Sequence, residues 1–98
     1  MAELIYSGRA LTDLDRLTDF LLETDPASAL ATADLIIEAI EVLVNHPSIG
    51  RPVEEGLREV LISRGRSGYD ALYSYEEAED SILVLAVRHQ REAGYLDL

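Results

Sequence analysis

Arg, His and Tyr side chains gather in one short stretch near the C-terminal end of the sequence. Arg88, His89 and Arg91 follow an apolar run directly, and Tyr95 stands four residues further on. Guanidinium groups bind phosphates through paired hydrogen bonds, and His or Tyr can transfer a proton. Cleavage of RNA by its own 2′-hydroxyl requires such a base, acid and cation. The stretch is therefore a candidate catalytic site, unless Arg88 simply pairs with an acid across a sheet and His89 merely ends a strand.

The arginines are unevenly placed along a chain that contains no lysine. The first 56 residues carry three Arg against eleven acids, whereas the remainder carries five Arg against eight acids. Any anion-facing or partner-facing surface must therefore lie in the C-terminal half. We expect its five arginines to cluster in space: Arg58, Arg64, Arg66, Arg88 and Arg91. The alternative is that each pairs with a nearby acid on the surface.

Other kinds of site are poorly supported. The chain has no cysteine, and its two histidines stand 43 positions apart, which leaves no recognisable metal-binding pattern. No phosphate-binding glycine loop with its lysine and no nucleophile elbow is present. Paired acids such as Glu76 and Glu77 fall in expected loops, where they are solvated. We therefore expect no metal and no organic cofactor.

Length and charge limit the class of protein. Residues 1–98 make one domain, with 48% hydrophobic residues and a net charge of −11. Such a charge repels bulk nucleic acid, because nucleic-acid binding depends on neutralising phosphates. No apolar run reaches the roughly 18 residues that a membrane-spanning helix needs. We expect a cytoplasmic protein that does not bind membranes.

The N-terminal half predicts a short strand and a helical hairpin. Residues 3–6 read as an edge strand, and Ser7 is a plausible cap for a helix over residues 9–23. Ala10, Leu14, Leu17 and Leu21 recur at helical spacing in that helix, which puts Asp13 on the polar face. Asp25 is expected to cap a second helix that runs from Pro26 to about Asn45.

The second helix carries a broad apolar stripe. Its members are Leu30, Ala33, Ile37, Ile40 and Val44, widened by Ala29, Ile36 and Leu43. We expect the other helix and the sheet to bury the whole stripe. The alternative is that a partner or a second copy of the chain, in a homodimer, covers part of it.

The C-terminal half changes from helical to extended periodicity. After a loop with two prolines over residues 46–52, strands are expected over residues 57–63, 69–75 and 82–87. Val60 and Ile62 share one face, and the apolar run 82–87 predicts a central strand covered on both faces. The order β-α-α-β-β-β predicts an α+β fold, with the helical hairpin on one face of a mostly antiparallel sheet.

Four segments, together with this element order, resemble a known family. They are residues 47–51 (PSIGR), 57–59 (LRE), 68–73 (GYDALY) and 84–92 (VLAVRHQRE). The chain is similar over nearly its whole length to the RelE/ParE superfamily, the plasmid stabilisation toxins of type II toxin–antitoxin systems. The resemblance implies a small cytoplasmic toxin that inhibits growth and is neutralised by a cognate antitoxin protein.

The resemblance leaves two targets open. RelE-like members cut mRNA on the ribosome, whereas ParE-like members inhibit DNA gyrase and are not nucleases. If this chain is aligned with nucleolytic members, His89, Arg91 and Tyr95 fall on their catalytic positions. Arg66 or Arg88 would then hold phosphate. Asp70, however, stands where RelE-like nucleases typically place an Arg, and its carboxylate would repel a scissile phosphate.

Charge and Asp70 together favour the ParE-like branch. Ribosome-directed toxins are usually basic, and this chain carries −11. We therefore rank gyrase inhibition first and ribosome-dependent mRNA cleavage second. A toxin-fold module whose only activity is antitoxin binding or self-association is third. The antitoxin is expected to lie over the helical hairpin or along a sheet edge, near the five arginines.

Overall fold

The computed structural model describes residues 1–64 and 67–92 of the chain. Nine elements follow one another: β1 (Glu3–Tyr6), α1 (Gly8–Thr24), α2 (Pro26–Glu41), η1 (Val42–Val44), β2 (Arg51–Pro52), η2 (Glu54–Gly56), β3 (Leu57–Arg64), β4 (Ser67–Glu76) and β5 (Ser81–His89). The expected β-α-α-β-β-β order is confirmed, with the two-residue strand β2 added. Neither described helix is long and apolar enough to span a membrane.

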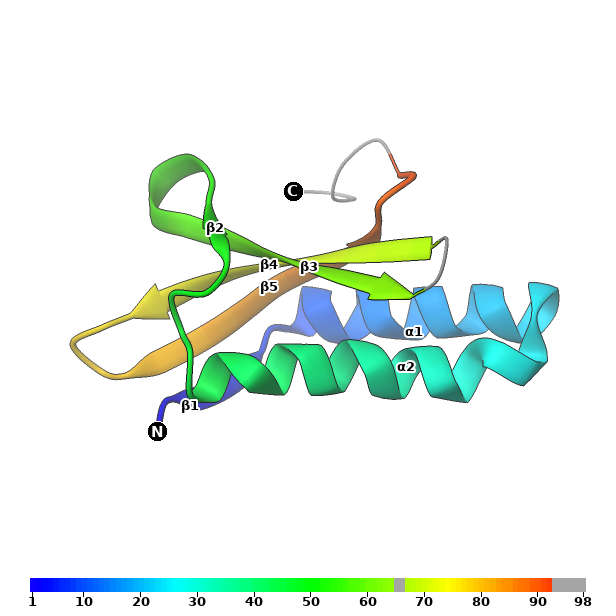
Figure 1. Ribbon diagram of the computed structural model, residues 1–98, viewed down its shortest axis with the longest axis horizontal. Coiled ribbons are helices and arrows are strands. Elements are labelled where there is room, and N and C mark those ends of the chain that lie inside the picture. The colour runs from blue at the N-terminus through cyan, green and yellow to red at the C-terminus, as the bar shows by residue number, and fades with distance from the viewer. Residues whose placement is uncertain (65–66, 93–98) are drawn as a thin grey trace.

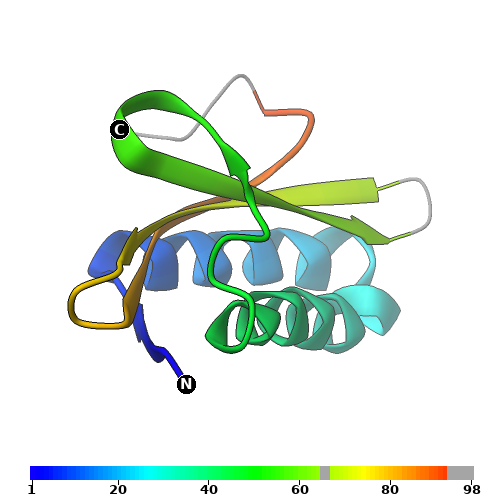
Figure 2. The same ribbon diagram turned by 60° about the vertical axis from the view of Figure 1, so that its left-hand side comes forward.

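The five strands form one mixed sheet in the order β1-β5-β4-β3-β2. Strand β1 pairs in parallel with β5, and every other neighbouring pair is antiparallel. Figures 1 and 2 show that both helices lie on the same face of this sheet. The predicted α+β layer architecture is therefore confirmed, and β5 is a central strand as expected.

Helix α1 begins where the sequence predicts. The Ser7 side chain accepts a hydrogen bond from the Ala10 backbone N–H at 3.0 Å, which satisfies one free donor of the first turn. Ala10 and Leu17 are buried against the sheet. Asp13 is buried with them, at 2% exposure, so its expected place on the polar face is wrong. Its position explains the error, because it lies on the same helical face as Ala10 and Leu17.

Helix α2 differs from expectation at both ends. Pro26 occupies its first turn as predicted, but Asp25 makes no side-chain capping bond. Instead, the backbone N–H of Asp25 bonds to Leu21 O at 2.7 Å, and its carbonyl accepts from Ser28 N at 3.0 Å. The helix ends at Glu41, because residues Val42–Val44 tighten into a 3₁₀ turn.

The apolar stripe of α2 is only partly buried. Its buried face consists of Ala29, Thr32, Ile36 and Ile40, continued by Leu43 of η1. Leu30 is 76% exposed and Ile37 is 39% exposed, so the expectation that the hairpin and sheet cover the whole stripe is wrong. A helix that lies on a sheet buries about one side only, and these two residues lie beyond that side.

The core lies between the helices and one face of β4 and β5. Tyr69, Ala71 and Tyr73 alternate toward the helices and pack with the apolar face of β5. Along β5 buried positions alternate with partly buried ones such as Leu83 and Leu85, until Ala86 and Val87 are buried together. The expectation that this strand is covered on both faces is therefore met only at that end, since both helices lie on one face of the sheet.

The loop before β2 is held by hydrogen bonds from Tyr73 and Arg58. The Tyr73 hydroxyl donates to Pro47 O at 2.7 Å and accepts from Gly50 N at 3.0 Å. Arg58 donates to the carbonyls of Ser48 and Gly50, at 3.1 and 2.7 Å. A Cβ atom at position 50 would stand 2.7 Å from the Tyr73 ring, so the close approach requires glycine.

Candidate functional site

The C-terminal end of β5 extends beyond β1, remains paired with β4 and lies beside α1. The register of β1 with β5 ends at the pair Tyr6 and Val84. Beyond this point, side chains bond the outer edge of β5. Ser7 Oγ donates to Leu85 O at 3.0 Å, and Asp13 Oδ2 accepts from Val87 N at 3.0 Å. The end of the strand is thus fixed to the start of α1.

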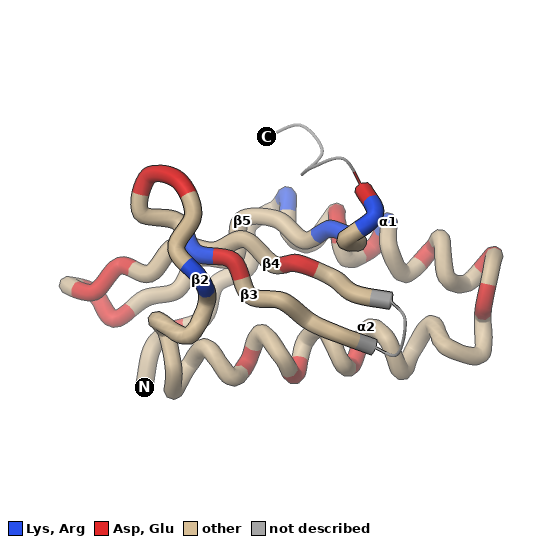
Figure 3. The backbone as a smooth tube through the Cα atoms, turned by 45° about the horizontal axis from the view of Figure 1, so that its top comes forward, with Lys and Arg blue, Asp and Glu red and all other residues tan. Residues whose placement is uncertain are grey.

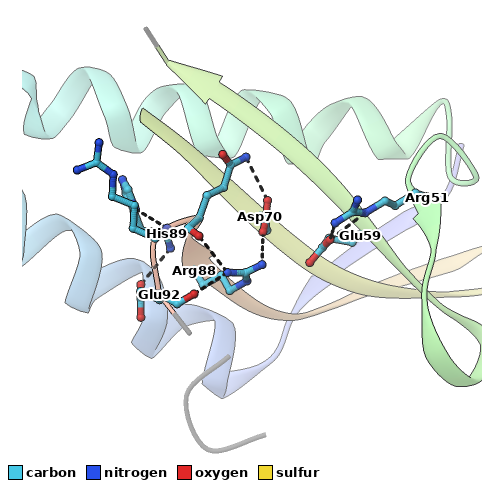
Figure 4. Close-up of polar contacts among 8 residues, drawn as sticks. Arg51, Glu59, Asp70, Arg88, His89 and Glu92 are labelled. Atoms are coloured by element: carbon cyan, nitrogen blue, oxygen red, sulfur yellow. Dashed lines mark hydrogen bonds and ion pairs between the residues drawn. The ribbon is translucent and has the colours of Figure 1, made fainter. Parts of the chain in front are cut away.

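A buried ion pair lies on the sheet face opposite the helices. Arg88 Nη2 stands 2.6 Å from Asp70 Oδ2, with the two side chains 18% and 3% exposed. Gln90 Nε2 donates to the other oxygen of Asp70 at 3.3 Å. Figure 4 shows these side chains converging from β4 and the end of β5. The sequence alternative that Arg88 pairs with an acid across the sheet is therefore confirmed.

The ion pair with Arg88 shows that Asp70 does not play the role expected from the sequence. The sequence suggested a carboxylate that would repel phosphate from an open site. Asp70 is instead 2% exposed and directed at Arg88. Its effect on anion binding is indirect, since it compensates the guanidinium charge that a phosphate would otherwise meet.

His89 ends β5 and lies on the helix-facing side. Its ring makes an edge-to-face contact with Tyr69, with centroids 5.1 Å apart and an interplanar angle of 85°. Its Nδ1 atom accepts a hydrogen bond from the Arg91 backbone N–H at 3.0 Å. Nδ1 can accept only when it carries no proton, so the neutral ring has its proton on Nε2 and offers that N–H as a donor.

A mostly apolar pocket of about 530 Å³ lies between α1 and the turn after β5. Its lining residues are Arg16, Phe20 and Leu21 of α1, Tyr69 of β4, and His89, Arg91 and Glu92. Phe20 is 63% exposed, which is high for a side chain of this size. An apolar pocket with a few charged groups at its rim is the common form of a binding site.

The predicted site residues are brought together only in part. His89 and Arg91 both line the pocket. Arg88, one residue before His89, points to the other face of the sheet. Tyr95 and Arg66 lie outside the described residues, as does the side chain of Arg64.

The position of Arg58 shows that the five arginines do not all cluster in space as expected. Arg58 lies at the start of β3, where its cross-strand partner is Tyr73, on the helix-facing side. Its guanidinium bonds to the loop carbonyls of Ser48 and Gly50. Arg58 therefore does not join Arg88, because register and loop contacts hold the two on different faces. Figure 3 shows the described Arg positions near β2 separated from those around the end of β5.

Sequence reasoning missed the charged residues that tie this region together. Arg16 Nη1 donates to Glu92 Oε1 at 3.1 Å, and Arg16 Nη2 stands 3.6 Å from Asp13 Oδ1. The missed signal is the spacing of Asp13, three residues after Ala10 and four before Leu17, on the core face of an amphipathic helix. A carboxylate at such a position needs a polar partner within the core.

Metal binding has no support in the described part of the chain. No group of three or more His, Asp or Glu side chains gathers there in a way that could hold a metal ion. The polar groups of the region instead bond to one another and to the backbone.

Sequence comparison finds one family model and related toxins. The model described as "ParE toxin of type II toxin-antitoxin system, parDE" matches residues 4–94. The chain is 33% identical over 84 residues to "Toxin RelE3" of Caulobacter vibrioides, covering 86% of this chain and 89% of that protein. It is 34% identical over 88 residues to "Toxin RelE1" of the same organism, covering 90% and 92% respectively.

Solved structures share the fold. A chain of the chromosomal ParDE system from P. aeruginosa superposes with a TM-score of 0.73 at 26% identity, covering 91% of this chain and 96% of that one. A chain of the toxin–antitoxin complex RelBE2 from Mycobacterium tuberculosis gives a TM-score of 0.62 at 21% identity, covering 91% and 98%. The second likeness, at its low identity, shows the fold alone.

Proposed function

Because the chain belongs to the RelE/ParE superfamily and is a toxin of a type II toxin–antitoxin system, we propose that it acts in the ParE manner, by binding and inhibiting DNA gyrase. Such a mechanism needs a binding surface and no catalytic residue. It also places the toxin in the cytoplasm, where gyrase works.

One observation carries this choice of target. The Arg88 guanidinium, which the resemblance offers as a phosphate-holding cation, is 2.6 Å from the buried carboxylate of Asp70. Attack of a 2′-hydroxyl on phosphate builds negative charge that a nuclease must stabilise with a free cation. A guanidinium already paired with a carboxylate supplies little of that stabilisation. The net charge of −11 further opposes approach to ribosomal RNA.

A second candidate is ribosome-dependent cleavage of mRNA. His89 and Arg91 line the same pocket, and the His89 tautomer offers an Nε2–H donor there. The two Caulobacter relatives carry RelE names. In this alternative His89, Arg91 and Tyr95 lie near the chemistry.

A cognate antitoxin is the expected partner in either case. Several of the superposed chains come from toxin–antitoxin complexes or systems. The exposed Leu30 and Ile37 offer apolar contacts on the hairpin that the toxin itself does not cover. Whether an antitoxin or a second copy of the chain covers them can be decided by measuring the mass of the toxin with and without its antitoxin.

The test uses the purified full chain in two assays. We expect inhibition of gyrase-catalysed supercoiling and intact mRNA in a translation reaction. The variant His89→Ala should leave mRNA intact as well, and His46→Ala is its matched control, since His46 is exposed in the loop before β2. Cleavage of mRNA on ribosomes that is lost in His89→Ala and Tyr95→Phe, with normal supercoiling, would establish the RelE-like alternative. A chain that does neither, and that is harmless without its antitoxin, would be a binding module.

A further inference from the structure

The turn after β5 is bonded to β4 and, through one side-chain pair, to helix α1. Residues His89 to Glu92 carry two of the pocket-lining side chains that the sequence singled out. The carboxylate of Glu92 folds back to accept the His89 backbone N–H at 3.0 Å. The same oxygen accepts from Arg16 of α1 at 3.1 Å. Arg16, on a helix far away in the sequence, is thus the contact that ties the Glu92 side chain of this turn to α1.

The guanidinium of Arg16 also contacts a second carboxylate, which is buried. Asp13 lies one helical turn earlier, and its side chain is only 4% exposed. One of its oxygens accepts from Val87 N, while the other stands 3.6 Å from Arg16. Two carboxylates thus contact different nitrogens of one guanidinium, which restricts where that guanidinium can lie. We call Asp13, Arg16 and Glu92 the α1 clamp.

The clamp spans the pocket described above. Arg16 forms part of the α1 wall and Glu92 part of the opposite wall, so their bond joins the two. The Arg16 and Glu92 side chains are 34% and 23% exposed, so solvent weakens their pairing without removing it. If this bond opens, Arg88 still connects the turn to Asp70, but the turn is no longer held at a fixed distance from α1.

We propose that the α1 clamp sets the width of the pocket and the placement of His89 and Arg91, and that Asp13, Arg16 and Glu92 are positioning residues for target recognition. The proposal rests on the proposed function in one respect, that this pocket faces the target. It assigns a role in toxicity to two residues of α1 that bear no resemblance to a catalytic or target-binding motif.

The test compares charge-keeping and charge-losing variants of the clamp. Arg16→Gln removes the charge, whereas Arg16→Lys keeps it on a similar stem. Glu92→Gln keeps an acceptor for the His89 N–H but loses the attraction to Arg16. Asp15→Asn on the exposed face of α1 and Glu79→Gln in the exposed β4–β5 hairpin are the matched controls. Each full-length variant is measured for growth arrest, supercoiling inhibition, melting temperature and amide exchange.

Arg16→Gln and Glu92→Gln should weaken inhibition about five- to tenfold, the scale of one lost charge-assisted hydrogen bond. Arg16→Lys should lose less inhibition than Arg16→Gln, because an ammonium keeps the attraction to the carboxylates but not the contacts of two separate nitrogens. Exchange of the His89 and Arg91 amides should accelerate in the charge-losing variants, with the melting temperature close to that of the wild type. The two controls should match the wild type in all four measurements.

Wild-type potency in Arg16→Gln would overturn the proposal, as would unchanged exchange of the His89 and Arg91 amides in that variant. Growth arrest separates this outcome from a wrong target. If the wild type arrests growth without inhibiting supercoiling, gyrase is the wrong target, and the ranking of variants by growth arrest still decides the role of the clamp. A wild type that neither arrests growth nor inhibits supercoiling would overturn both.

Discussion

Buried carboxylates have specific partners in the described part of this acidic chain. Asp13, Glu59 and Asp70 are each at most 5% exposed. Asp13 accepts a backbone N–H, Glu59 accepts from Arg51 Nε at 3.0 Å, and Asp70 pairs with Arg88. Burial of a charge is costly unless hydrogen bonds or an opposite charge compensate it. Substitutions at these acids therefore test the structure most directly.

Replacement of Asp13 should reduce the free energy of unfolding by more than the loss of its charge alone would explain. Asp13→Ala leaves the Val87 N–H buried without its acceptor, for which we expect a loss of about 2 kcal/mol in the free energy of unfolding. Urea denaturation measures this loss. Asp15→Ala, two residues along on the exposed face, should change stability by less than about 0.5 kcal/mol. Equal effects of the two substitutions would contradict the buried hydrogen bond.

The ion pair of Arg88 and Asp70 should be sensitive to loss of one partner. Arg88→Ala leaves Asp70 charged and buried, at a cost of about 3 kcal/mol, the lower end of the range because Arg88 is 18% exposed. The double variant Arg88→Met with Asp70→Leu should recover most of that stability, since no uncompensated charge is left. Both are measured by urea denaturation. A single variant as stable as the wild type would show that the pair is not formed in solution.

Single residues differ in how well the sequence predicts their surroundings. The partner of Arg88 was foreseeable, because an acid on the neighbouring strand was one of two clear alternatives. The burial of Asp13 is not predicted, because an acidic residue is assigned to the polar face of a helix even where its spacing matches the apolar residues. The separation of Arg58 from Arg88 depends on strand register, which the sequence does not specify at single-residue accuracy.

At the scale of elements, strand β4 fixes the loop before β2. Tyr73 reaches the backbone of Pro47 and Gly50 from the core, and its ring fills the space that a side chain at position 50 would need. The loop in turn presents Ile49, which is 60% exposed. An ordered loop with an exposed apolar side chain is a further surface that a partner can contact.

Removal of the Tyr73 hydroxyl should loosen this loop. Tyr73→Phe loses two hydrogen bonds and should cost about 2 kcal/mol of unfolding free energy. Exchange of the Gly50 amide should accelerate more than that of amides in α1. Tyr75→Phe is the matched control on the same strand, because the Tyr75 hydroxyl donates to Asp80 at an exposed site. If Tyr73→Phe left Gly50 exchange unchanged, the loop would owe its order to Arg58.

The elements show why sequence periodicity succeeds and fails. Both helices and the three long strands are predictable, because helical and alternating spacing persist over many residues. Strand β2 has two residues, one of them a proline, and is too short to show a period. In α2 apolar residues lie on more than one side, so periodicity alone could not tell that Leu30 and Ile37 are exposed. The pocket brings together α1, β4 and the end of β5, and only tertiary packing creates it.

At the scale of the whole molecule, tyrosine ionisation should limit alkaline stability. Burial raises the pKa of Tyr73 above its usual 10.0, and burial also raises the pKa of Tyr6, with a smaller contribution from Glu41. Above pH 10 the unfolded chain therefore loses these protons more readily than the folded chain. Folding stability is fully present below pH 10 and should fall as pH rises above it.

Melting temperatures across this range measure the effect. The decline above pH 10 should be shallower in Tyr6→Phe, which removes one of the tyrosines with a raised pKa and a hydroxyl that has no hydrogen-bond partner among the described residues. At neutral pH that variant should be at least as stable as the wild type. A stability that rises above pH 10, or a decline equally steep in Tyr6→Phe, would contradict this assignment.

The parallel pairing of β1 with β5 has a consequence for biosynthesis. Glu3 pairs with Ser81 and Tyr6 with Val84, so the first strand to be made has its partner among the last. A growing polypeptide cannot complete this sheet until translation has passed residue 89, and folding by such distant contacts is slow. Until then the helical hairpin lacks most of the surface against which it packs. The newly made chain consequently passes through an interval in which the apolar face of this hairpin is exposed to solvent, before the last strand covers it.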